Sequence, residues 1–183
     1  MNSIRIASLT KKLLQEIEGK ELREGLVNTP MRVARAYKEL FDGYSIDIDS
    51  LFTIFDGEAI DQLVIARNIP FNSVCEHHLL IFEGVAHVAY LPDKQAIGAS
   101  KLPRLVLAFA HRLQLQERIA EQVAHTLMDK LKPKGVAVII EGKHSCIRCR
   151  GVKVDCDWVN SIMLGEFREN PTLRMEVLLL LKR

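Results

Sequence analysis

The sequence predicts an α+β fold whose sheet is largely antiparallel. Two helical segments come first, and segments of β character, two helices, further β segments and a closing helix follow. Strands that pair around a layer of helices in this order are typical of the α+β class. The 183 residues fit one domain with a small extension, and we expect a helical segment over residues 1–45 and the main domain over residues 46–183.

Two amphipathic helical patterns fill most of the first 45 residues. Over residues 4–17, apolar side chains recur at helical spacing, with Lys and Glu between them. NTPMRVARAYKELFDGY predicts a second helix, capped by Thr29 and with Pro30 in its first turn. Arg32 and Arg35 share one face of this helix, and by local pattern alone they are solvated side chains.

The rest of the chain alternates β and helical patterns. Residues 44–60 predict a connecting loop, and the stretches QLVIARNIPF and EGVAHVAYLP, rich in β-branched or aromatic residues, predict strands. Residues 100–131 predict two helices that part near residues 113–115, with Ser100 as the N-cap. The remaining segments are a strand at VAVIIEG, a strand at CRGVKVDCDWV, and a helix at NPTLRMEVLLLLKR that begins near Asn170 or Thr172.

Charge and hydropathy argue against two classes of function. The net charge of +2 is too small for nucleic-acid binding by bulk electrostatics. No apolar run is long enough to span a bilayer, and the first residues lack a signal-peptide core, so we expect a cytoplasmic protein with no membrane or nucleic-acid partner. A sheet of few strands leaves open edges, which predicts that copies of the chain associate.

The cysteines are spaced as in a metal site. Cys75 precedes two histidines in VCEHHLL, and Cys146, Cys149 and Cys156 fall within eleven residues. In the reducing cytosol this pattern predicts metal binding or catalysis before disulfides. Cys75 and His78 have C-x-x-H spacing, so a tight turn at a strand end would direct both side chains at one zinc ion.

The stretch KHSCIRCRG offers the remaining ligands in two ways. Cys146 and Cys149 together would complete a closed structural site, whereas one thiol alone would leave a position open for water, as catalytic zinc needs. His77 and His144 adjoin the candidate ligands and can move protons near neutral pH, which favours the catalytic alternative. If the segment is extended, His144 and Cys146 point to the same face. Outside a metal site, Cys149 and Cys156 are expected to be buried or half-buried thiols.

These segments resemble, in order, the signatures of the GTP cyclohydrolase I family. The matching stretches are SVCEHHLL, YLPDKQAIGASKLPRLV, RLQLQERIAEQV, HSCIRCRG and SIMLGEFRENPTLRMEVL, and NTPMRVAR matches the family's N-terminal helix. The resemblance covers about residues 20–183. It implies the tunnelling fold, in which subunit sheets join into a barrel. It also implies self-association into a toroidal homodecamer of two pentamers, with active sites at subunit interfaces.

The reaction is likewise implied by the resemblance. The family hydrolyses GTP at C8 of the guanine, releases formate and forms 7,8-dihydroneopterin triphosphate, the first step toward folate or tetrahydrobiopterin. Carried over to this sequence, Cys75, His78 and Cys146 would bind Zn²⁺, which acidifies the water that attacks C8. His77 and His144 would move protons during ring opening and formyl hydrolysis.

The substrate contacts follow from the same resemblance. Glu117 would hold the guanine edge, because a carboxylate accepts the parallel N1–H and 2-amino donors together, and Gln116 would assist it. Hydroxyl and basic side chains would surround the ribose and the triphosphate, for which Arg offers fork-shaped donors. These are Ser100, which also counts among the catalytic residues, and Lys101, Arg104, Arg150, Arg32 and Arg35.

Three features depart from the family pattern. Cys149 stands where the family usually has an apolar residue, and an exposed thiol there could bind metal or be oxidised with Cys146. The segment VKVDCDWVNS is one residue shorter than usual and carries Trp158 and Asn160 in place of small hydroxyl residues, which affects the strand register. The family's GLSKL reads GASKL here.

Three functions compete at this point. A zinc-dependent GTP cyclohydrolase I requires an open metal position. A non-catalytic homologue, acting as a scaffold or regulatory subunit, predicts a four-ligand site that includes Cys149. A related enzyme acting on another purine or pterin would need only Glu117, but the residues assigned to the triphosphate favour a nucleoside triphosphate.

Overall fold

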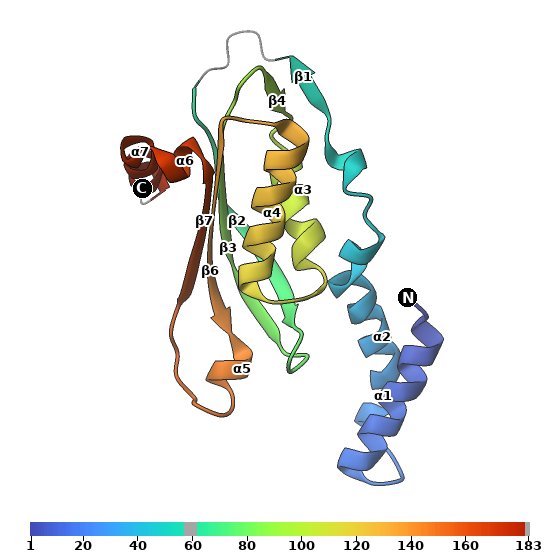
Figure 1. Ribbon diagram of the computed structural model, residues 1–183. Coiled ribbons are helices and arrows are strands. Elements are labelled where there is room, and N and C mark those ends of the chain that lie inside the picture. The colour runs from blue at the N-terminus through green and yellow to red at the C-terminus, as the bar shows by residue number, and fades with distance from the viewer. Residues whose placement is uncertain (57–61, 182–183) are drawn as a thin grey trace. The chain divides into compact units, whose positions relative to one another are not determined.

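The computed structural model describes residues 1–56 and 62–181. It contains two compact units, Met1–Asp42 and Gly43–Arg183, so the division falls slightly before the expected boundary at residue 45. The first unit holds α1 (Ser3–Glu18), a short 3₁₀ helix (Glu24–Leu26) and α2 (Thr29–Leu40) (Figure 1). Both predicted helices are therefore confirmed.

The N-terminal cap of α2 differs from the prediction. Asn28 occupies the cap position and makes no side-chain hydrogen bond there, whereas Thr29 is the first helical residue. Pro30 lies in the first turn, as predicted, where its missing N–H costs no hydrogen bond. Arg32 and Arg35 are both exposed on this helix.

A five-stranded sheet with the order β5-β2-β3-β6-β7 forms the second unit. All neighbouring strands are antiparallel except the short β5, which is parallel to β2. This confirms the predicted α+β class with a largely antiparallel sheet. The strands are β2 (Val64–Cys75), β3 (Ile81–Leu91), β5 (Leu113–Gln114), β6 (Gly135–His144) and β7 (Trp158–Gly165).

The segment predicted as a loop at residues 44–60 is partly ordered. It contains 3₁₀ turns at Asp42–Ser45 and Asp49–Leu51, and then β1 (Ile54–Asp56), which pairs antiparallel with β4 (Gln95–Ile97). Pairing between segments about forty residues apart leaves no local signal, which is why the prediction missed β1. Residues 57–60 of the predicted loop lie outside the described residues.

The predicted strand at residues 149–159 is wrong for most of its length. The chain forms α5 (Ser145–Arg148) and then an irregular segment, and β7 begins only at Trp158. Gly151 and Lys153 adopt positive φ, which ends an extended chain. The alternating Val152 and Val154 that suggested a strand are both exposed.

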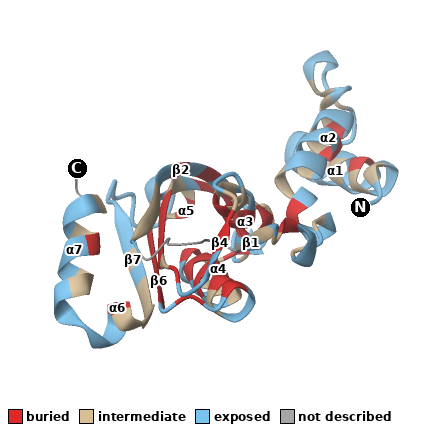
Figure 2. Ribbon diagram, turned by 90° about the horizontal axis from the view of Figure 1, so that it is seen from above, coloured by how far each residue is buried: buried red, intermediate tan, exposed pale blue. Residues whose placement is uncertain are grey.

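The helices cover the two faces of the sheet separately. On one face, α3 (Lys101–Ala110) and α4 (Gln116–Leu131) enclose the main hydrophobic core, where buried residues concentrate (Figure 2). On the other face lie α6 (Glu166–Glu169) and α7 (Pro171–Leu181), with Phe167 and Val177 packed against the sheet. Asn170 caps α7, as predicted, because its side-chain oxygen accepts the Thr172 N–H at 3.0 Å.

The register of β2, β3 and β6 determines at which end of the sheet β2 and β6 terminate. Phe82 of β3 pairs with Ser73 on one side and with His144 on the other. Cys75 is the last residue of β2, and His144 is the last residue of β6. The two segments that carry the candidate metal ligands therefore leave the sheet at the same end, on either side of β3.

No helix in residues 1–56 or 62–181 combines the length and the apolar character that a bilayer crossing requires.

His87 is a buried titratable group on the sheet face opposite α3 and α4. Its Nδ1 atom accepts the backbone N–H of Asn68 at 3.4 Å, and its Nε2 atom lies 3.9 Å from a Glu141 carboxylate oxygen. Burial lowers the pKa of His87; the Glu141 carboxylate opposes this shift and Arg67 reinforces it. His87 is therefore held neutral in the folded chain.

The lowered pKa of His87 predicts a contribution to acid sensitivity. Unfolding restores the ordinary pKa, so the unfolded chain binds more protons, and stability is lost as the pH falls through the lowered native pKa. His87→Gln keeps an acceptor for Asn68 but cannot titrate. We expect its melting temperature to fall less than that of the parent between about pH 8 and about pH 5. Equal falls in both proteins would contradict this assignment.

Candidate active site

A tight turn follows β2 and directs two of the predicted ligands to one side. The Leu79 N–H donates to the Cys75 carbonyl at 2.9 Å, and Leu79 adopts a positive φ of 55°. The Cys75 N–H donates to the Leu80 carbonyl at 2.9 Å, which closes the turn against β3. Cys75 and His78 are three residues apart in this turn, and the Cys75 Sγ atom lies 3.7 Å from His78 Nδ1.

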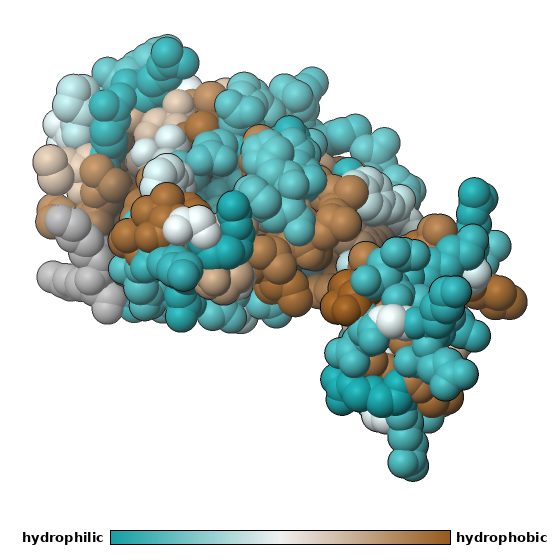
Figure 3. Space-filling view, turned by 90° about the horizontal axis from the view of Figure 1, so that it is seen from below, coloured by the Kyte–Doolittle hydropathy of each residue, from teal (hydrophilic) through white to brown (hydrophobic). Residues whose placement is uncertain are grey.

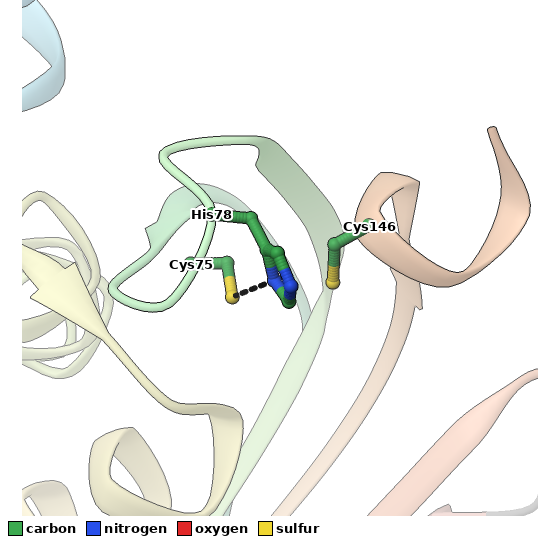
Figure 4. A group of neighbouring side chains, drawn as sticks. All are labelled: Cys75, His78 and Cys146. Carbon is green, nitrogen blue, oxygen red and sulfur yellow. Dashed lines mark hydrogen bonds between the residues drawn. The ribbon is translucent and has the colours of Figure 1, made fainter. Parts of the chain in front are cut away.

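Cys146 completes a group that could hold a metal ion. It lies on α5, immediately after β6, and its sulfur faces the Cys75–His78 pair (Figure 4). The ligand atoms of Cys75, His78 and Cys146 all lie within 4.8 Å of one another. This is the one group of three or more such side chains found in the described part of the chain, and Cys149 is not a member of it.

The Cys146 thiol is buried beside the Cys75 thiol. Burial raises the pKa of Cys146 above the usual thiol value, and the neighbouring Cys75 raises it further through its charge and a hydrogen bond. Without a metal the Cys146 thiol therefore keeps its proton. A cation bound between the sulfurs would reverse this preference, because a metal favours thiolates.

His144 lies beside this group but is positioned differently from the prediction. Residues 144–146 are not extended, because the chain turns into α5 at Ser145. The His144 ring stacks on Phe82 with centroids 4.6 Å apart and an interplanar angle of 8°. Burial lowers the pKa of His144, and the Glu117 carboxylate opposes this shift. The imidazole is therefore neutral near neutral pH and able to accept a proton.

The tautomer of His144 follows from its partner Gln116. The Gln116 amide is fully buried, and its nitrogen shares two hydrogens among the carbonyls of Ile140 and Trp158 and the side-chain oxygen of Asn160, at 3.1, 2.8 and 2.8 Å. The amide oxygen must then face His144 Nε2, 3.0 Å away, and accept a hydrogen bond from the Nε2–H. Nδ1 of His144 is left with the free lone pair.

One cavity of about 250 Å³ joins these groups. Its lining includes both thiols, both histidines of the turn, His144, Gln116 and Glu117, so seven of the predicted site residues come together. Glu117 is exposed in the first turn of α4 and accepts the Trp158 indole N–H at 3.2 Å. The cavity thus combines candidate metal ligands, a neutral imidazole and a carboxylate.

The predicted ribose and phosphate contacts are not among the described residues that line this cavity. Ser100, Lys101 and Arg104 lie at the start of α3, next to β4, at the opposite end of the sheet from α5 (Figure 1). Arg150 comes closer, with a guanidinium nitrogen 3.4 Å from His78 Nε2. Arg32 and Arg35 belong to the first unit and stay predictions.

The expectation that Cys149 and Cys156 are buried is wrong. Both thiols are exposed, and Cys149 lines a separate shallow hollow with Arg148 and Asp155. Its position three residues after Cys146 suggested a shared site. However, the single turn of α5 ends at Arg148, and Cys149 follows in an exposed position.

The sequence alone did not identify the partner of Glu76. Its carboxylate forms a two-pronged ion pair with Arg118 of α4, in which one of the two contacts measures 3.0 Å. The hydrogen bond from Arg118 lowers the pKa of Glu76 and keeps it ionised. The pair connects the turn that carries Cys75 and His78 to the helix that carries Gln116 and Glu117. The partners are 42 residues apart, so no local pattern could have predicted it.

Comparisons with known proteins agree over nearly the whole chain. The sequence model of the family described as GTP cyclohydrolase I matches residues 6–182. The GTP cyclohydrolase 1 of Leptospira biflexa is 46% identical over 178 residues, which cover 96% of this chain and 97% of that protein. The GTP cyclohydrolase 1 of Listeria innocua is 48% identical over 181 residues, which cover 97% of this chain and 95% of that protein.

A partial structural likeness accompanies these matches. The archaeosine synthase QueF-Like in its apo form aligns with a TM-score of 0.44 and 18% identity, covering 54% of this chain and 91% of that one.

The Glu76–Arg118 pair predicts a measurable effect on metal binding. Arg118→Gln removes the bidentate partner and should loosen the turn that orients Cys75 and His78. Outer partners of metal ligands typically contribute about 10- to 100-fold in affinity, and we expect a loss in that range, measured by competition with a chelator. The matched control is Lys130→Gln, which removes an exposed ion pair to Asp49 from the same helix. Equal affinities in the two variants would refute a positioning role for Arg118.

Proposed function

Because the chain belongs to the GTP cyclohydrolase I family, we propose that it hydrolyses GTP to 7,8-dihydroneopterin triphosphate and formate at a zinc ion held by Cys75, His78 and Cys146. The observation that carries this proposal is the cavity in which those three ligands, a neutral imidazole and the Glu117 carboxylate converge. Each of these groups matches a role that the reaction needs.

The donor set fits zinc. Two thiolates and one imidazole are ligands that zinc prefers, and ideal tetrahedral bonds would place sulfur and nitrogen about 3.6 Å apart. The separation between Cys75 Sγ and His78 Nδ1 is 3.7 Å. Three protein ligands leave one coordination position for solvent or substrate, which is the pattern of catalytic zinc sites. A zinc ion bound there would supply Lewis acidity and a water of lowered pKa.

The histidines supply proton transfer in this proposal. His144 is neutral, and Gln116 fixes its Nε2 proton, so Nδ1 is the nitrogen that accepts a proton during opening of the imidazole ring of guanine and hydrolysis of the formyl group. His77 lines the same cavity and is exposed, so its ring can exchange protons with solvent. The stacking on Phe82 limits rotation of the His144 ring.

Glu117 provides the recognition of guanine. The carboxylate can accept the N1–H and the 2-amino group together, and adenine lacks this pair of donors. Gln116 cannot donate to the base in the described arrangement, because its amide nitrogen is engaged with Ile140, Trp158 and Asn160. Its proposed role is therefore to orient His144 and to support the first turn of α4.

The phosphate contacts require a second copy of the chain in this proposal. Ser100, Lys101 and Arg104 would complete the site of a neighbouring subunit, and Arg150, with Arg32 and Arg35, would add charge. Unpaired apolar side chains support association: Val159 on the edge strand and Met175 and Leu179 on α7 are exposed, and Figure 3 shows apolar surface among the polar side chains. We propose that copies of the chain assemble into a toroidal homodecamer, in which the sheets of neighbouring subunits join into a barrel.

A scaffold without catalysis is the alternative. It would be favoured by a closed four-ligand site, but Cys149 is exposed and stands outside the three-residue group. The open position therefore supports the enzyme.

The metal assignment predicts different effects for the two thiols of the C-x-x-C segment. Cys146→Ser should lower zinc affinity by more than the roughly 10- to 100-fold of an outer-shell change, because it removes a ligand. Cys149→Ser is the matched control and should retain stoichiometric zinc, measured by elemental analysis after dialysis. Zinc loss in both variants would instead indicate the closed Cys₃His site.

The proposed reaction predicts a direct assay. The zinc-loaded protein incubated with GTP should release formate, and oxidation of the product should yield fluorescent neopterin. His144→Ala should lower the rate of formate release by about 10²- to 10⁴-fold, the usual contribution of a general base or acid, with GTP binding retained. Full zinc occupancy without product would disprove the proposed activity and leave the scaffold.

A further inference from the structure

Trp158 is the first residue of β7, and its side chain lies on the face of the strand toward α4. In β7 the side chains of residues 158, 160, 162 and 164 share one face, and Ile162 and Leu164 pack against the core that α3 and α4 enclose. Trp158 pairs across the sheet with Gly142, where the absent side chain leaves room for the Gln116 amide, because a β-carbon there would collide with Gln116 Oε1. The indole is directed toward the first turn of α4, where its N–H donates to Glu117.

Two hydrogen bonds connect Trp158 to the residues that face the base. Its indole N–H donates to Glu117 Oε1 at 3.2 Å, and its main-chain carbonyl accepts the Gln116 amide at 2.8 Å. A carboxylate has about four lone-pair directions, so Glu117 can keep the indole bond and still accept two donors from a base. An exposed glutamate otherwise samples many rotamers, and the indole bond selects one of them.

The indole ring is also available as a surface for the base. Trp158 lines the same cavity as Glu117, His144 and the candidate metal ligands, and 47% of its area is exposed. Aromatic faces in nucleotide-binding proteins stack on bases with a contribution equivalent to about 5- to 150-fold in affinity. Phe82 is an aromatic side chain in the same lining, but its face is occupied by the His144 ring.

We propose that Trp158 is a substrate-contacting and specificity-determining residue of this site, whose N–H holds Glu117 in position and whose exposed ring stacks on the guanine base. The inference deepens the proposed function and rests on it. It assigns a role to a residue that stands where small hydroxyl side chains are usual in the family, and it identifies the preferred ligand as a purine with adjacent N1–H and 2-amino donors.

Steady-state kinetics of the zinc-loaded protein separate the contribution of the indole N–H from that of ring stacking. Trp158→Phe keeps an aromatic ring and loses the N–H, whereas Trp158→Ser loses both. We expect the KM for GTP to rise about tenfold or more in Trp158→Ser, with kcat changed much less. In both variants we expect the preference for GTP over ITP, which lacks the 2-amino group, to narrow. The matched control is Val154→Ser, an exposed residue of the irregular segment before β7, which should leave both parameters unchanged.

Tryptophan fluorescence gives a readout that would not respond to GTP if Trp158 had a purely structural role. Trp158 is the sole tryptophan of the 183 residues, so the intrinsic emission reports on this position alone. In His144→Ala, where turnover is slow, GTP should quench or shift the emission saturably, and ITP should do so at higher concentration. Zinc content and melting temperature measured alongside exclude misfolding of the variants.

The outcomes distinguish this inference from the proposed function. An active parent whose Trp158 variants keep the same KM and the same GTP preference overturns the role of Trp158 alone. Emission that does not respond to saturating GTP also overturns it, and would indicate that the indole is covered by another subunit. A parent that forms no product defeats the proposed activity, whereas saturable quenching by GTP in that protein would still support Trp158 as a base contact.

Discussion

The register of β2, β3 and β6 is the constraint on which the site depends. Phe82 pairs with both Ser73 and His144, so the Cys75 turn and α5 leave the sheet at one end with β3 between them. A slip of one residue would carry Phe82 and His144 to opposite faces and end their stacking. Gly84 helps to fix this register, because a β-carbon there would collide with the backbone carbonyl of Glu141 on β6. The convergence of Cys75, His78 and Cys146 therefore depends on strand pairing as well as on the turn.

A buried amide extends this constraint from the sheet to the helices. Gln116 is fully buried, and burial of an amide is tolerable only when its hydrogen bonds are satisfied. Its partners lie on β6, on β7 and on His144, so one side chain connects the start of α4 to the two strands and to the His144 ring. Glu76 and Arg118 connect the same helix to the turn that carries Cys75 and His78. The candidate ligands, the imidazole and the Glu117 carboxylate are therefore held by one connected set of contacts.

Local patterns in the sequence predicted the long helices and the pairing of Cys75 with His78, whereas Cys146 as the third member of the group followed from the family resemblance. The spacing of Cys75 and His78 predicted a turn that directs both side chains at one ion, and the structure contains that turn. Contacts between distant segments were not predictable in the same way. Neither the Glu76–Arg118 pair nor the start of β7 leaves a periodic signal, because both depend on which segments become neighbours after folding. The assumption of an extended chain at His144 failed because α5 begins at the next residue.

The charges around the cavity support the proposal that a nucleoside triphosphate would need a second copy of the chain. Neither Lys nor Arg occurs among the described residues that line the cavity, whereas Glu117 adds a negative charge there. A triphosphate placed beside these groups would need cationic partners, because unpaired charges are costly to remove from water. The hydroxyl of Ser73, two residues before Cys75, donates to the carbonyl of Ala110 at the C-terminal end of α3. The basic N-terminal end of α3 is therefore separated from the cavity by the length of that helix, about 15 Å. Arg150 approaches His78 but supplies a single charge. In the proposal, a second copy would present its own α3 start to this cavity and supply the missing cations, so that the reaction would take place at an interface between subunits.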